Sequence, residues 1–96
     1  MHVIRKVRLG LEGEQHLLLP DEAVVLGVGP LVAPEGTGLF LWYHTHVMEG
    51  GHHRTVRLVL TAEDIPGHLA GMRWLGMVTL NPEAPRQMYQ VFLEVP

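Results

Sequence analysis

Hydrophobic and polar positions along this chain fall into short runs, separated by clusters of glycine, proline, asparagine and aspartate. The runs are rich in β-branched and aromatic residues, a composition typical of strands. The predicted strands span residues 2–9, 15–19, 23–28, 39–48, 52–60, 72–80 and 87–95. The spacing predicts a mainly β fold, either a compact antiparallel sandwich or a partly open barrel of about seven strands, built as one domain over residues 1–96.

Two segments do not follow the strand pattern. Residues 29–38, "GPLVAPEGTG", are rich in glycine and proline, which predicts a mobile loop. Residues 61–71, "TAEDIPGHLAG", are the only helical candidate. With Asp64 as the N-cap, Pro66 falls in the first turn, where its missing N–H costs little. One short helix ending near Gly71 is therefore expected.

The segment "LFLWYHTHVMEGGHHRTVRLVL" reads as a hairpin between residues 39–48 and 52–60. A three-residue "EGG" loop would mix apolar and charged groups on both faces. A two-residue turn at Gly50-Gly51 separates them, and glycine supplies the positive φ values that such a turn requires. The apolar face then holds Leu39, Leu41, Tyr43, Thr45, Val47, Val56, Leu58 and Leu60. The other face holds Phe40, Trp42, His44, His46, His53, Thr55, Arg57 and Val59.

That second face combines aromatic and cationic groups and predicts a ligand-binding site. Trp42 or Phe40 would stack on a nucleotide base, while Arg57, His44 and His46 would contact a phosphate. The predicted ligand-binding residues are Phe40, Trp42, His44, His46, His53 and Arg57. A structural alternative is equally open, in which the short helix or a second subunit covers this face.

The histidines also permit a metal site. A His-x-His on a strand points both imidazoles to one side, and the neighbouring strand supplies a third, so the candidate ligands are His44, His46 and His53. Zinc with an open position for water would suit this set and would imply a hydrolase. The alternative is a group of solvated histidines with no cofactor, since neither a carboxylate nor a cysteine completes a metal signature.

Composition narrows the function classes. The chain has no cysteine and no serine, which removes disulfides, Cys-ligated zinc and the Gly-x-Ser-x-Gly nucleophile. The formal charge of −3 gives no basic excess for general DNA binding. No apolar run approaches the roughly 20 residues that span a bilayer, so we expect a soluble cytoplasmic protein. An enzyme is not indicated, and no catalytic residue is assigned.

Several segments, taken in order, resemble a family of short uncharacterised phage-encoded proteins. The resemblance is carried by "GEQHLLLPDEAVVLGV", "LFLWYHTH", "RTVRLVLTAEDIP", "WLGMVTL" and "YQVFLEV". The chain departs from that pattern after "RTVRLVL", where Thr61-Ala62-Glu63-Asp64 replaces a Gly-Thr-Gly-His-like turn. The resemblance implies a small accessory protein in the cytoplasm of an infected bacterium. It brings no established activity.

The leading hypothesis is a non-enzymatic binding protein that sequesters a phosphate-bearing, nucleotide-type ligand such as a bacterial immune signal. The second is a protein-interaction or virion component that uses the same face against a host or viral protein. A zinc-dependent hydrolase is third. We expect a homo-oligomer, because a domain this small exposes sheet edges and apolar surface that natural proteins cover.

Overall fold

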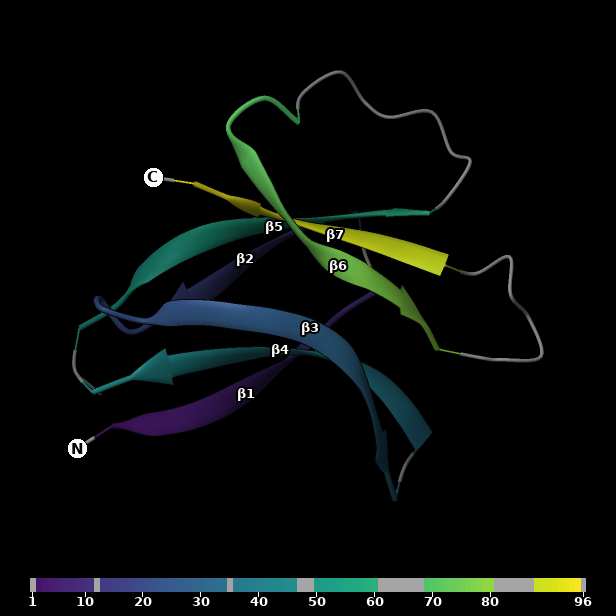
Figure 1. Cartoon of the computed structure of the whole chain (residues 1–96), viewed down its shortest axis with the longest axis horizontal. Coiled ribbons are helices and arrows are strands. Elements are labelled where there is room, and N and C mark those ends of the chain that lie inside the picture. The colour runs from purple at the N-terminus through teal and green to yellow at the C-terminus, as the bar shows by residue number, and fades with distance from the viewer. Residues whose placement is uncertain are drawn as a thin grey trace.

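A computed structural model describes residues 2–11, 13–34, 36–46, 50–60, 69–80 and 88–95. These residues form seven strands in two antiparallel sheets (Figure 1). The strands are β1 (Val3–Leu9), β2 (Glu14–Leu19), β3 (Val24–Ala33), β4 (Gly36–Thr45), β5 (His52–Leu60), β6 (Met72–Thr79) and β7 (Met88–Glu94). The predicted seven-stranded antiparallel sandwich is confirmed, and the sheets do not close into a barrel.

The three-stranded sheet has the order β1-β4-β3. β3 and β4 form a hairpin across residues 34 and 35, with Val32 opposite Thr37 and Ala33 opposite Gly36. The prediction of a loop over residues 29–38 is therefore wrong. Pro30 is accommodated because β3 is an edge strand, where a residue without an N–H removes no bond to a further strand.

The four-stranded sheet has the order β2-β5-β7-β6. Its middle strands β5 and β7 pair with Leu58 opposite Val91. β3 and β6 approach each other where the two sheets meet: a Cβ placed on Gly76 would lie 3.4 Å from Cγ2 of Val28. The sheets thus lie side by side along one edge and are separated elsewhere by the core (Figure 1).

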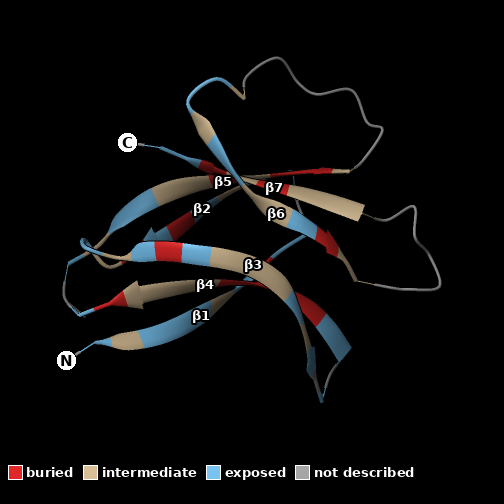
Figure 2. Cartoon of the chain, viewed as in Figure 1, coloured by how far each residue is buried: buried red, intermediate tan, exposed pale blue. Residues whose placement is uncertain are grey.

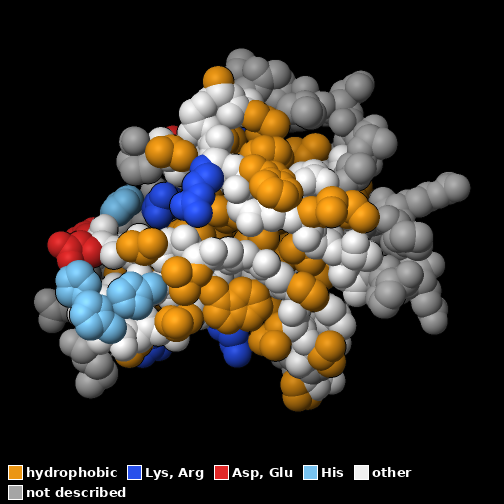
Figure 3. All heavy atoms as spheres, viewed as in Figure 1, with side chains coloured by type: hydrophobic (Ala, Val, Ile, Leu, Met, Phe, Trp, Pro, Cys, Tyr) orange, Lys and Arg blue, Asp and Glu red, His pale blue; other side chains and the backbone are white. Residues whose placement is uncertain are grey.

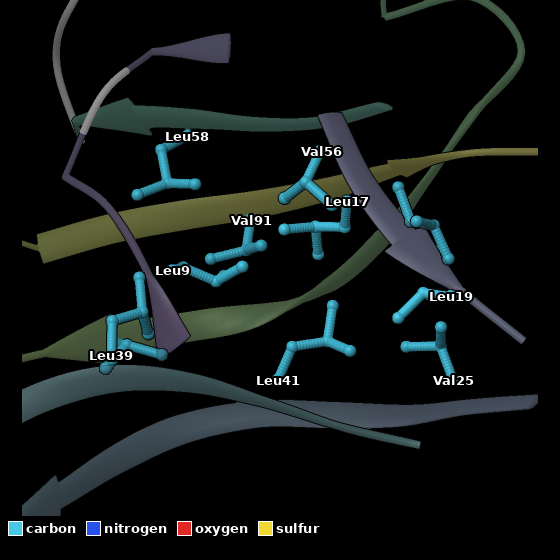
Figure 4. Packing of buried hydrophobic residues seen from close by; sticks show 11 residues of the cluster. Leu9, Leu17, Leu19, Val25, Leu39, Leu41, Val56, Leu58 and Val91 are labelled. Atoms are coloured by element: carbon cyan, nitrogen blue, oxygen red, sulfur yellow. The ribbon is translucent and has the colours of Figure 1, made fainter. Parts of the chain in front are cut away.

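The core lies between the two sheets. Its largest fully buried hydrophobic side chains come from β2, β4, β5 and β7, and Figure 4 shows most of the core cluster between these strands. They are Leu19, Leu39, Leu41, Val56, Val91 and Leu93. Buried and more exposed positions follow one another along the strands (Figure 2). Of the side chains predicted to face inward, Leu39, Leu41, Thr45, Val56 and Leu58 are buried, as alternation along a strand requires. Phe40 and Val59, predicted for the other face, are buried as well, and Val47 lies outside the described residues.

The predicted hairpin between residues 39–48 and 52–60 is wrong. β4 pairs with β1 and β3, whereas β5 pairs with β2 and β7 in the other sheet. The chain passes from one sheet to the other between Thr45 and His52. Gly50 and Gly51 do have positive φ values, of 74° and 145°, but they serve this passage and not a two-residue turn.

The turn between β2 and β3 holds both ends of the passage. Asp21 Oδ1 accepts a hydrogen bond from the backbone N–H of Gly51 at 3.0 Å and lies 3.2 Å from Nδ1 of His52. The next residue, Glu22, places Oε2 2.8 Å from Nε2 of His46. Two adjacent carboxylates therefore contact the last described residue before the passage and the first strand residue after it.

The predicted short helix falls mainly on residues 61–68, which lie outside the described residues. Ala70 and Gly71, at its expected end, form a turn before β6. Within the described ranges we find no helix long and apolar enough to cross a lipid bilayer.

Replacing Gly50 by alanine should lower the free energy of unfolding by about 2–3 kcal/mol. An L-residue is strained at this positive φ, and the new Cβ would collide with the carboxylate of Asp21. Urea unfolding of the variant measures the loss. Gly13→Ala is the control, because a Cβ there meets nothing within 4 Å and φ is not positive; it should change stability by less than about 0.5 kcal/mol. Equal effects at both positions would contradict this account.

Candidate binding face

The predicted site residues lie in two different sheets. Phe40, Trp42 and His44 are on β4, on the side of the three-stranded sheet that faces away from the core. His53 and Arg57 are on β5, on the outward side of the four-stranded sheet. Because the core separates the inward faces of the two sheets, these two groups cannot contact one ligand. The ligand-binding face predicted from the hairpin therefore does not form as one surface.

Arg57 is already paired within its own sheet. Its Nη2 donates to Glu14 Oε1 on β2 at 3.1 Å, and its side chain is only 19% exposed. His53 faces Leu18 across the β2–β5 pair. Arg57 is therefore a poor candidate for phosphate binding, since a phosphate would have to displace a partly buried ion pair.

The three-stranded sheet supplies cations that the sequence reading did not connect with Trp42. In the β1–β4 register, Lys6 lies opposite Trp42 and Arg8 lies opposite Phe40. Residues that are opposite each other on antiparallel strands point to the same face, so both cations accompany the aromatic rings on the outward side. None of the ion pairs among the described residues uses Lys6 or Arg8.

Phe40 is structural in this arrangement. It is only 8% exposed, and its ring is approached by Nζ of Lys6 at 5.9 Å and by Cζ of Arg8 at 6.0 Å from the centroid. Both distances lie within the range of cation–π attraction. The prediction that Phe40 offers a stacking surface is therefore not supported. Trp42, 6.2 Å away between ring centroids, is half-buried and retains an exposed part.

Two glycines of β3 lie on the other side of Trp42, and the strand is open at one of them. Gly27 lies opposite Trp42 on β3, and a Cβ there would meet nothing within 4 Å. At Gly29 a Cβ would touch the indole, 3.5 Å from Cζ3. Glycine inside a strand often marks a place where a ligand or another backbone approaches closely. On the β1 side, a shallow hollow of about 460 Å³ is lined by Ile4, Arg5, Lys6, Trp42 and Tyr43.

The remaining predicted residues, His44 and His46, gather at one end of this sheet with His2. Nδ1 of His2 lies 3.2 Å from Nε2 of His44, and the ring centroids of His2 and His46 are 5.3 Å apart. Figure 3 shows histidine side chains gathered at the end of the molecule near the N-terminus, beside acidic groups. His53 is on the other sheet, so the predicted metal set of His44, His46 and His53 is not brought together.

No protein-family model, curated protein or solved structure matches the chain. The resemblance to phage-encoded proteins therefore remains a prediction from the sequence.

Phe40→Ala should lower the free energy of unfolding by about 3 kcal/mol, as expected for removing a large buried ring. Removing Lys6 with K6A should change stability far less, because its side chain is exposed. Thermal and urea unfolding of both variants measure the difference. If F40A were as stable as the unmodified chain, Phe40 would not be part of the packed structure.

Proposed function

We propose that the outward face of the three-stranded sheet binds a phosphate-bearing, nucleotide-type ligand and that the protein holds the ligand without transforming it. The observation that carries this proposal is the cross-strand pair of Lys6 and Trp42. The ammonium group of Lys6 has no carboxylate partner among the described residues. The register places it beside the partly exposed indole of Trp42.

The chemistry of the pair fits the two halves of a nucleotide. A base stacks on an aromatic side chain with a gain of about 1–3 kcal/mol. The open backbone of Gly27 gives a flat ring room beside the indole of Trp42. Lys6 and Arg8 then supply cations for the phosphate, in the role that the sequence reading gave to Arg57. His44 is the next outward residue of β4 and adds a further polar group.

A second cationic hollow is less suited to this ligand. It lies at one end of the core, has a volume of about 280 Å³ and is lined partly by Arg54 and Arg73. Asp21 also lines it, and none of the described residues in its walls is Phe, Tyr or Trp. Arg54 Nη2 is directed towards the carbonyl oxygen of Glu94 at 3.4 Å. This hollow offers charge without a stacking surface, so the Trp42 face supports nucleotide binding better.

The biological setting of the proposal is sequestration of a bacterial immune signal in an infected cell. This setting is supported by the sequence resemblance alone. An open sheet face buries only one side of a ligand, so tight sequestration requires a second surface. A second copy of the chain is the simplest source, in line with the expected homo-oligomer.

A protein-interaction role is the second candidate, and exposed apolar side chains favour it. Val24, Leu26 and Val32 on β3 are 51–78% exposed, and Trp74 and Met77 on β6 are 54% and 52% exposed. Figure 3 shows hydrophobic side chains along both strands on the viewed face. Surfaces of this kind are common at contacts between proteins. Light scattering after gel filtration shows whether the chain associates with itself.

The nucleotide proposal is tested by tryptophan fluorescence. In a Trp74→Phe background Trp42 is the only tryptophan, so quenching of the tryptophan emission by linear or cyclic nucleotides reports stacking on that residue. We expect quenching together with thermal stabilisation, and recovery of the nucleotide intact. Unchanged fluorescence and melting temperature across the nucleotide panel would overturn the proposal.

Three variants and one control locate the site. Trp42→Leu and Lys6→Ala should each weaken binding about tenfold or more, as expected for loss of a stacking surface or a charge-assisted contact. Gly27→Val should fold, because a Cβ has space there, yet cover the open strip beside the indole and weaken binding. Arg57→Ala should leave the affinity unchanged. If R57A lost binding while K6A kept it, the ligand would lie on the other sheet.

A further inference from the structure

The histidines at the end of the three-stranded sheet form a group that the strand register itself creates. Ile4 lies opposite His44 on the β1 side, and Val24 lies opposite His44 on the β3 side. Continuing each pairing by two residues brings His2 and Glu22 to either side of His46. His2, Glu22 and His46 lie just beyond the ends of these strands, and their contacts bring them together with His44 at this end of the sheet.

The distances within the group suit metal ligands. Nδ1 of His2 and Nε2 of His44 are 3.2 Å apart. Two nitrogen ligands of a tetrahedral zinc ion, each at about 2.0–2.1 Å, lie roughly 3.3–3.4 Å from each other. The ring centroid of His2 lies 5.1 Å from that of His44 and 5.3 Å from that of His46. The three imidazoles therefore surround one region of the surface.

Glu22 provides the partner that a metal-bound histidine normally has. Its Oε2 lies 2.8 Å from Nε2 of His46, which fits an Nε2–H that donates to the carboxylate. The lone pair of His46 is then on Nδ1. Metal-binding histidines usually donate their second ring N–H to a carboxylate or a carbonyl, which fixes the tautomer and raises the basicity of the ligating nitrogen.

We propose that His2, His44 and His46 bind a divalent ion of the zinc and cobalt class, with Glu22 as the outer partner of His46. Imidazole nitrogens favour these ions over magnesium or calcium, which take oxygen ligands. In the described part of the chain, no group of three His, Cys, Asp or Glu side chains is already arranged to hold a metal ion. To complete the set, the His46 side chain, which is 45% exposed, has to turn towards His2 and His44, and Glu22 has to follow it to keep their contact.

This site differs from the metal set read from the sequence and does not depend on the proposed function. His2, which directly precedes β1, takes the place of His53. A bound ion would join the start of β1 to the end of β4 through their side chains. Binding should therefore raise the thermal stability of the folded chain increasingly as the free metal concentration exceeds the dissociation constant, whether or not a nucleotide binds beside Trp42.

The experiment uses the full chain produced without a histidine tag. Zinc is titrated calorimetrically, and cobalt is followed by its visible absorption, which distinguishes tetrahedral from octahedral coordination. We expect one ion per chain, a tetrahedral cobalt spectrum and a higher melting temperature with zinc. Absence of heat, of a tetrahedral spectrum and of stabilisation would overturn the proposal.

Histidine variants distinguish the two possible metal sets. H2A, H44A and H46A should each weaken zinc binding at least about tenfold. Loss of an outer partner alone often has an effect of that size, and these variants remove a ligand itself. H53A is the matched control and should bind zinc as tightly as the unmodified chain. Melting of each variant without metal verifies folding, and H44Q replaces H44A if the latter fails to fold. Loss of binding in H53A, or its retention in H2A, would overturn the assignment.

Discussion

The passage of the chain from one sheet to the other after Thr45 determines what each outer surface contains. Asp21 and Glu22, consecutive in the β2–β3 turn, contact the two ends of this passage through Gly51, His52 and His46. With β4 and β5 in different sheets, their inward side chains face each other across the core, and their outward side chains lie on opposite surfaces of the molecule. A tight hairpin would have placed both sets of outward residues on one surface and would have left the core without its two layers.

The strands and their inward positions follow from local pattern, and for that reason the sequence predicts them well. Val56 and Leu58 must be inward whichever strand lies beside β5, because alternation depends only on the strand itself. The choice of partner is not local. Gly50-Gly51 adopts positive φ values in a two-residue turn and also in the observed passage, so the same residues satisfy both topologies. The segment at 29–38 shows the converse error: its glycines and prolines suggested a loop, although an edge strand accepts Pro30.

The candidate site was predictable only in part for the same reason. Trp42 and His44 were identified because they share a strand, and a period of two suffices to place them together. Lys6 and His2 were missed because β1 lies about forty residues earlier in the chain, and no local pattern states that it pairs with β4. Gly27 was missed as well. A glycine leaves space for a ligand only beside a suitable residue, and the sequence does not show that Trp42 lies opposite it.

The position of Phe40 beneath the two β1 cations has a consequence for binding strength. Long basic side chains on a surface usually sample many rotamers, and ordering them on a ligand costs about 0.5–1.5 kcal/mol each. Here the ammonium of Lys6 and the guanidinium of Arg8 approach one aromatic ring. Part of their freedom is thus already lost when the sheet folds, in the absence of any ligand. A buried phenylalanine that never touches an anion would in this way preorganise the groups that do.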